Sequence, residues 1–217
     1  MPIRSALAAI VLAVTTAAAK SPALSEVLSA LERAAEGERG PAAKLGVQLD
    51  GFNWFQHVRL DEPITPVKVS TSAIVISRNL EGQLLLFRGQ SMVASQSLAE
   101  PIRVTPALVQ CGSSSAPLGL LIESIDVRGT GVYESDFHLL SGEADKLKDL
   151  WHAPSRWSFR ATQRSGAEEG HGFLNIDDAC PPTFLYLEEG VRDGRRIKRR
   201  LSFTIVDGKV KPLRQGT

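Results

Sequence analysis

The chain contains four histidines, side chains suited to proton transfer near neutral pH and to metal binding: His57, His138, His152 and His171. Their spacings match none of the short motifs that bring two histidines together on one helix or strand to bind zinc. The sequence therefore predicts no metal site and no cofactor. A catalytic site would have to be assembled in space, and the residues that we expect to form it are Asp136, His138 and His171.

The sequence does not indicate a serine nucleophile. One large class of hydrolases holds this serine in a sharp strand-to-helix turn with the pattern G-x-S-x-G. The stretch Gly112-Ser113-Ser114-Ser115-Ala116 lacks the second glycine, and no helical pattern follows it. We interpret it as a loop.

A run of basic residues near the C-terminus is the strongest charge feature of the chain. In the hairpin predicted below, Arg196, Lys198 and Arg200 lie on the face opposite the core, while Glu188 and Glu189 oppose neighbouring cations. Such a strand can be a solvated sheet edge, where Lys and Arg prevent aggregation. It can also be a patch that attracts an anionic partner, such as lipid headgroups, a polysaccharide or an acidic protein.

Three aromatic side chains fall within five residues, at Phe52, Trp54 and Phe55. In a regular strand, Phe52 and Trp54 point to one face and Phe55 to the other. Burial in the core is the ordinary outcome for such residues. If it were exposed, the strip formed by Phe52 and Trp54 would suit a sugar or a hydrophobic partner.

The first nineteen residues have the composition of an export signal. Arg4 supplies a positive charge, residues 6–14 form a short apolar run, and Ala17-Ala18-Ala19 supplies the small residues before a cleavage site. The apolar run is shorter than the roughly 20 residues that span a bilayer. We therefore expect cleavage before Lys20 and a soluble protein, without an integral membrane anchor, in the periplasm or outside the cell.

The charge balance argues against one class of partner. The whole chain has 25 Lys and Arg against 24 Asp and Glu. Arg4 is the only charged side chain within residues 1–19, so its removal leaves no net charge with His neutral. General nucleic-acid binding depends on the neutralisation of phosphates by basic residues, and it is not predicted here.

The two cysteines, Cys111 and Cys180, both follow the expected cleavage site. Disulfides persist in the compartments to which exported proteins are delivered. An even number of cysteines, with no C-x-x-C motif, favours one disulfide over a metal site. Two unpaired buried thiols are the alternative.

The spacing of apolar residues predicts an N-terminal helix and a series of strands. Ser21 is expected to cap the helix, Pro22 to occupy its first position and Gly37 to end it. A second short helix is predicted between Leu139 and Trp151, with Ser141 as its cap. Apolar runs separated by turn residues predict strands over residues 73–77, 83–87, 118–127, 132–140, 157–163 and 173–177.

The C-terminal part is predicted to be a three-stranded meander. Asp193-Gly194 is typical of a two-residue hairpin turn. With these residues in the turn, the opposed pairs are Phe184 with Phe203, Tyr186 with Leu201, Glu188 with Arg199 and Glu189 with Lys198. Asp207-Gly208 predicts a second turn that pairs Ile205 with Val210.

We therefore expect a mainly β protein, with antiparallel sandwich or barrel-like sheets, an N-terminal helix and one short internal helix. Propeller-like meanders are the alternative, although no repeat of fixed period is present. The expected organisation is a signal over residues 1–19, a helix and linker over 20–40, and a single β-rich domain over 41–217.

These features favour a non-catalytic binding or interaction module that engages a protein or an anionic envelope component. An envelope-acting hydrolase with the spatially assembled site named above is one alternative. A structural accessory of a larger assembly is another. No sequence feature indicates an oligomeric state.

The cysteine pair gives the first testable prediction. A bridge between Cys111 and Cys180 would close a loop of about 70 residues and stabilise the fold by roughly 4 kcal/mol in the chain-entropy model. A thiol-reactive dye added to denatured, non-reduced protein should therefore detect no free thiol, and two thiols should appear after reduction. Two reactive thiols before reduction would contradict the bridge.

Overall fold

The computed structural model describes residues 21–60, 70–109, 118–143, 146–160, 166–177, 180–206 and 209–213. The expected export signal and Cys111 lie outside these residues. Within them, no helix combines the length and the apolar character needed to cross a membrane.

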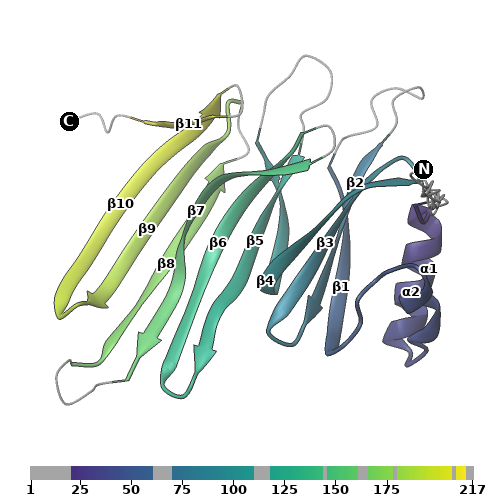
Figure 1. Ribbon diagram of the computed structural model, residues 1–217. Coiled ribbons are helices and arrows are strands. Elements are labelled where there is room, and N and C mark those ends of the chain that lie inside the picture. The colour runs from purple at the N-terminus through teal and green to yellow at the C-terminus, as the bar shows by residue number, and fades with distance from the viewer. Residues whose placement is uncertain are drawn as a thin grey trace, which may run out of the picture.

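In this part of the chain, eleven antiparallel strands form one sheet in which each strand lies beside its neighbours in sequence (Figure 1). Two helices precede them, which confirms a mainly β fold with an N-terminal helix and one short helix. The elements are α1 (Leu24–Ala35), α2 (Gly40–Lys44), β1 (Phe52–Arg59), β2 (Thr71–Arg78), β3 (Glu81–Arg88), β4 (Ser91–Leu108), β5 (Leu118–Gly129), β6 (Val132–Glu143), β7 (Lys146–Phe159), β8 (Glu168–Asp177), β9 (Thr183–Arg192), β10 (Arg195–Val206) and β11 (Lys209–Pro212).

Strand β4 changes its partner halfway along its length. Residues 91–99 pair with β3, whereas residues from Glu100 onward pair with β5. The sheet therefore turns a corner near Pro101, whose carbonyl oxygen accepts a hydrogen bond of 2.8 Å from Ser77 Oγ. Because of this corner, the first strands and the later strands can pack against each other.

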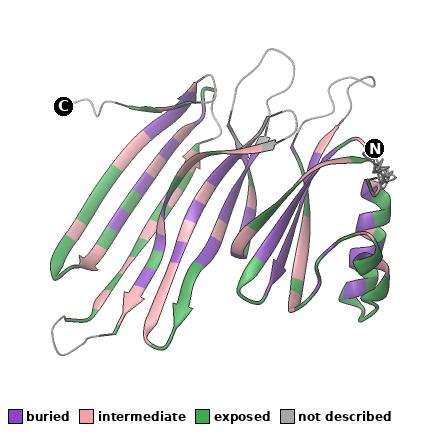
Figure 2. Ribbon diagram, viewed as in Figure 1, coloured by how far each residue is buried: buried purple, intermediate pink, exposed green. Residues whose placement is uncertain are grey.

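Both faces of β2 and β3 are buried as a result (Figure 2). Ile74, Ile76, Leu85 and Phe87 pack against α1 and α2. The alternate residues of the same strands pack against β4, β5 and β6, in a cluster that includes Leu120, Ile122 and Leu140. Burial on both faces explains why these two strands are continuous apolar runs and not alternating ones.

A further core joins the middle of the sheet to its C-terminal strands. It combines Leu121, Leu139 and Ala153 of β5 to β7 with buried residues of β9 and β10. The rings of Tyr186 and Phe203 lie 5.3 and 5.0 Å from that of Trp151. Strands β7 and β8 pair only over residues 156–159 with 168–171, which lets β8 to β10 fold over this face.

The predicted hairpins are confirmed. The Asp193-Gly194 turn gives the expected register, including Phe184 with Phe203 and Glu189 with Lys198. Ile205 pairs with Val210 as predicted, although Asp207 and Gly208 lie outside the described residues. The expected core face of the meander is also correct, since Phe184, Tyr186, Phe203 and Ile205 are buried, with Leu201 and Val210 packed against them.

The position of the second helix was predicted wrongly. Residues 139–151 belong mainly to β6 and β7, and the short helix is α2. A register shift leaves Leu150 without an opposed residue between Trp151, opposite Leu139, and Asp149, opposite Leu140. This extra residue gives the strand a local apolar spacing that imitates a helix.

Helix α1 also begins later than predicted. Its N-cap is Ala23, whose N–H donates to Glu26 Oε2 at 2.9 Å, so Ser21 is not the cap. The predicted end is correct, because Gly37 follows the helix with a φ of 104°.

Two glycines allow the indole of Trp157 to lie against the sheet. Trp157 is fully buried, and its Nε1–H donates to the Val191 carbonyl oxygen at 3.1 Å. A Cβ added at Gly170, directly opposite Trp157, would collide with the indole ring, and Gly190 lies beside the same ring. The indole of Trp157 thus leaves no room for a side chain at Gly170 or Gly190.

Substitution of Gly170 should therefore destabilise the fold. We expect Gly170→Ala to lower the free energy of unfolding by about 1–3 kcal/mol, the usual cost of overpacking a core, as measured by urea denaturation. Gly166→Ala is the matched control, because a Cβ there meets no atom within 4 Å. Equal stability of the two variants would contradict this packing.

Candidate functional site

The first candidate site is the outer face of β7 to β10, opposite the face that carries Trp157 and Tyr186. The strand registers align Arg156, His171, Glu189 and Lys198 in one row across the four strands. Opposed residues of antiparallel strands point to the same side of a sheet. A second row on this face contains Phe173, Leu187 and Arg200.

Two adjoining hollows lie along these rows. Their volumes are about 950 and 420 Å³, and both are lined by His171, Glu189 and Lys198. The larger hollow also contains Arg156 and Arg196, and the smaller one Phe173, Leu187 and Arg200. The face therefore combines a shallow groove with basic and apolar side chains.

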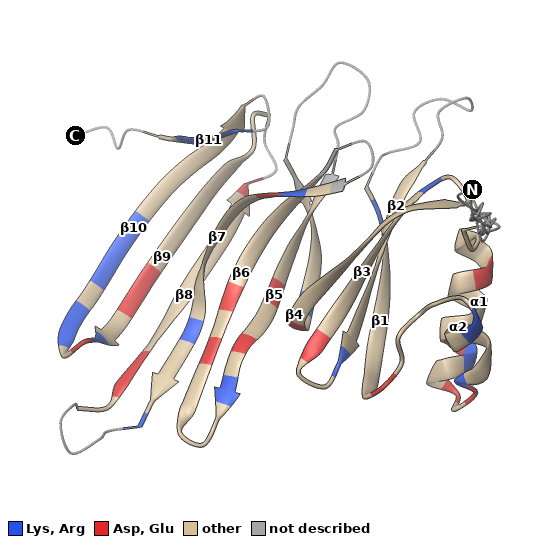
Figure 3. Ribbon diagram, in the orientation of Figure 1, with Lys and Arg blue, Asp and Glu red and all other residues tan. Residues whose placement is uncertain are grey.

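The predicted basic patch, Arg196, Lys198 and Arg200, lies on this face, and all three side chains are exposed. Figure 3 shows the basic run on β10 beside acidic residues on β9. Among the described residues, none of the three makes a salt bridge. Glu189, which opposes Lys198 in the register, lies instead 3.7 Å from His171 Nε2. The cations of the patch thus remain available to a partner.

Strand β10 is also an open edge over much of its length. It pairs with β11 only from Phe203 to Val206. Residues 195–201 have no strand on their outer side within the described part of the chain.

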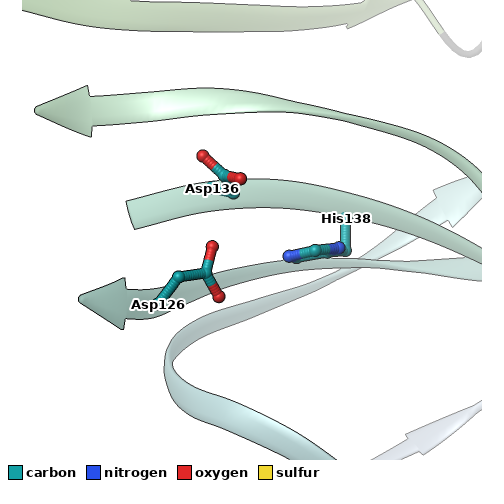
Figure 4. A group of neighbouring side chains, drawn as sticks. All are labelled: Asp126, Asp136 and His138. Atoms are coloured by element: carbon teal, nitrogen blue, oxygen red, sulfur yellow. The ribbon is translucent and has the colours of Figure 1, made fainter. Parts of the chain in front are cut away.

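The second candidate site is a cluster of Asp126, Asp136 and His138 (Figure 4). Asp136 and His138 are two residues apart on β6, so both point to the same side of the strand. Asp126 is an extra residue at a register shift in β5 between Ile125 and Val127. One potential ligand atom of each side chain lies within 4.8 Å of the others.

Asp136 is the most perturbed carboxyl group of this cluster. Partial burial, followed by the charge of Asp126 and a hydrogen bond with it, raises the pKa of Asp136 to about 6, against a smaller opposing effect of His138. Its Oδ1 atom is buried without a hydrogen-bond partner. The side chain therefore holds its proton more strongly than an ordinary aspartic acid.

Two further side chains border the cluster from β7. Asp149 Oδ2 lies 3.6 Å from His138 Nδ1 and 3.9 Å from His152 Nδ1. The two imidazole rings are stacked, with centroids 6.1 Å apart. Asp149 thus lies within ion-pair distance of the Nδ1 atoms of both histidines.

The structure assembles only part of the expected catalytic group. Asp136 and His138 lie together. His171 lies instead on the outer face of β8, where it contacts Glu189, so the prediction that His171 belongs to this group is wrong. Asp126 takes the third place. The alternation Asp136-x-His138 on a strand could have identified the pair, whereas Asp126 reaches it through a bulge that the sequence did not reveal.

The aromatic strip is not formed. A register shift between Phe52 and Trp54 leaves Asn53 without an opposed residue. Phe52 and Phe55 consequently pack against the helix-side core, while Trp54 packs against the cluster on the other side of β2 and β3. The prediction that Phe52 and Trp54 share one face is wrong because of this bulge.

The cysteine bridge remains a prediction, because Cys111 lies outside the described residues. Cys180 is exposed between β8 and β9, and no described cysteine is a free thiol.

Comparison of the chain with protein-family models, with curated proteins and with solved structures finds no significant match. The two sites described above are therefore the features from which a function can be inferred.

The raised pKa of Asp136 predicts that this side chain destabilises the fold at neutral pH. A carboxyl group whose pKa is higher in the folded state stabilises the fold when protonated, and this contribution is lost as the pH rises through about 6. With EDTA present, Asp136→Asn should therefore raise Tm at pH 7. Allowing for the partial exposure of Asp136, we expect about 1 kcal/mol, or roughly 2–4 °C.

This gain should vanish below about pH 4, where Asp136 is protonated in both the folded and the unfolded chain. Asp193→Asn, in the exposed turn before β10, is the control and should leave Tm unchanged. A gain that persists in acid would contradict the electrostatic origin.

Proposed function

We propose that this protein is an exported, non-catalytic binding module that engages an anionic envelope component through the outer face of β7 to β10. The observation that carries the proposal is the exposure, without salt bridges among the described residues, of Arg196, Lys198 and Arg200 beside the groove. Partners with negative charge are attracted to a cluster of this kind before contact is made.

The apolar side chains of the same face favour a partner that is not purely ionic. Phe173 is 58% exposed and Leu187 is 39% exposed, and both lie in the row that ends at Arg200. Large apolar side chains that are exposed together mark contact surfaces more often than isolated ones do. The partner that fits is an anionic amphiphile, with acidic groups over Arg196 and Lys198 and an apolar part over Phe173.

Export is the second component of the proposal, and it rests on the leader-like residues 1–19 and on the two cysteines. Envelope surfaces are rich in anionic lipids and polysaccharides. A protein delivered there with a basic and apolar face would encounter such material at high local concentration.

A hydrolase is the second candidate function, favoured by the convergence of Asp126, Asp136 and His138. Ser124 donates a hydrogen bond to Asp126 Oδ1 at 3.4 Å but is itself buried. The cluster therefore offers acid–base groups, and a hydrolase that used it would act through water.

The binding proposal is tested by charge reversal. We expect the triple variant Arg196→Glu, Lys198→Glu and Arg200→Glu to lose affinity for phosphatidylglycerol vesicles by about 100-fold or more, since each basic residue near an anionic surface contributes about 1 kcal/mol. Flotation or titration of the vesicles measures this affinity. Binding of the unchanged protein should weaken as salt is raised.

The matched control reverses three exposed cations near the helices, Arg33, Arg39 and Lys44. It alters the net charge equally, so it should retain most of the affinity if the site is local. An equal loss of vesicle affinity in both triple variants would show that the proposed face is not the lipid site. The same conclusion would follow if the unchanged protein bound phosphatidylcholine vesicles as tightly as phosphatidylglycerol vesicles. Heparin, assayed in parallel, replaces lipid as the probe for an anionic polysaccharide. Absence of binding to both probes, or binding that does not weaken as salt is raised, would reject the function.

A further inference from the structure

The cluster on β5 and β6 presents one imidazole and two carboxylates toward a common point. In Figure 4 the ring of His138 extends toward the carboxylates of Asp126 and Asp136. The separation of their ligand atoms, within 4.8 Å of one another, is small enough for one ion to contact all three after minor side-chain rotation. Neighbouring strands supply these groups, so the backbone holds them at a fixed spacing.

A third carboxylate lies beside the imidazole. Asp149 Oδ2 lies 3.6 Å from His138 Nδ1. Metal-binding histidines usually donate one ring N–H to a carboxylate or carbonyl, which fixes the tautomer and leaves the other nitrogen free to bind the ion. Asp149 lies beside Nδ1, just beyond hydrogen-bond distance, where a small side-chain rotation would complete this arrangement and leave His138 Nε2 for a ligand.

The two carboxylates have no basic side chain paired with them among the described residues. Asp136 Oδ1 is buried without a hydrogen-bond partner, and among the described residues no Lys or Arg forms a salt bridge with Asp126 or Asp136. Buried polar atoms are nearly always satisfied in folded proteins. A cation between the two carboxylates would provide the missing partner for Asp136 Oδ1 and remove the repulsion.

We propose that Asp126, Asp136 and His138 form a binding site for a divalent transition-metal ion, for which Zn²⁺ is the ion that the donor atoms fit best. Two carboxylate oxygens and one imidazole nitrogen are ligands that zinc accepts. Three protein ligands leave a fourth, tetrahedral position for water. Asp126 is exposed, so solvent and metal can reach the site.

The donor atoms distinguish zinc from the common alkaline-earth ions. Ca²⁺ takes six to eight oxygen ligands, and Mg²⁺ retains several waters and prefers oxygen. An imidazole within a set of three ligands disfavours both ions. Borderline transition metals bind imidazole readily.

A neighbouring arrangement offers a competing position for the ion. His138, His152 and Asp149 also lie close together, with both Nδ1 atoms near Asp149 Oδ2. That position would use His152 and would not need Asp126. The two assignments therefore predict different effects of substitutions in the cluster.

Isothermal titration of the metal-free, purified protein with Zn²⁺ tests the inference. We expect one ion per chain, and a loss of affinity greater than 10-fold for Asp126→Asn and for His138→Ala. Asp149→Asn should weaken binding by about 10–100-fold, as outer-shell partners do. His171→Ala is the control, because His171 contacts Glu189 outside the cluster, and its affinity should equal that of the unchanged protein.

Asp136→Asn separates loss of the ligand from loss of the fold. This variant, which keeps the shape of the side chain, should remain folded without metal and yet lose Zn²⁺ binding. Unchanged affinity in Asp126→Asn, with loss in His152→Ala, would place the ion at the competing position and overturn the assignment. Displacement of Zn²⁺ by equimolar Ca²⁺ or Mg²⁺ would overturn the choice of metal. The basic face of β10 does not enter this experiment, so its outcome is independent of the proposed function.

Discussion

The rest of the fold depends on the corner in β4. Glu100 is buried there, accepts a hydrogen bond of 3.2 Å from the Leu80 N–H and lies 3.4 Å from the Arg128 guanidinium. A Cβ on Gly82 would collide with the Pro101 ring, so the hairpin between β2 and β3 lies closely against the corner. These contacts turn a meander that would otherwise expose one apolar face into layers that cover each other. The apolar side chains enclosed on both sides of β2 and β3 stabilise the fold by the hydrophobic effect.

The two candidate sites follow from departures from regular pairing. A bulge in β5 brings Asp126 to Asp136 and His138, and the separation of β7 from β8 leaves a grooved face on β8 to β10. Bulges re-aim side chains at the point where a ladder is interrupted, and they are common beside functional sites. The regularly paired parts of the sheet form the core, whereas the polar groups of the two sites lie where the pairing is irregular.

The local structure was accessible from the sequence, whereas its long-range consequences were not. Asp193-Gly194 determined a ten-pair register correctly, because a two-residue turn leaves only one alignment of the flanking strands. The same reasoning placed Arg196, Lys198 and Arg200 on the outer face. The predictions near Asn53 and Leu150 were wrong because each of these residues forms a bulge, and an extra residue reverses the face of every residue after it. The approach of Asp126 and Asp149 to His138 depends on pairing between strands and on such a shift, and no local pattern encodes it.

The order of the strands has a consequence for how the chain acquires its structure. Within the described residues, each strand pairs only with its neighbours in sequence, and no pairing crosses over another strand. Each step of sheet growth therefore closes a short loop, at a small entropic cost. Folding can advance one hairpin at a time along the chain, at the pace set by local contacts. The N-terminal strands can therefore pair before the last strand has formed, whereas the corner in β4 and the core between β5–β7 and β9–β10 require distant residues to meet.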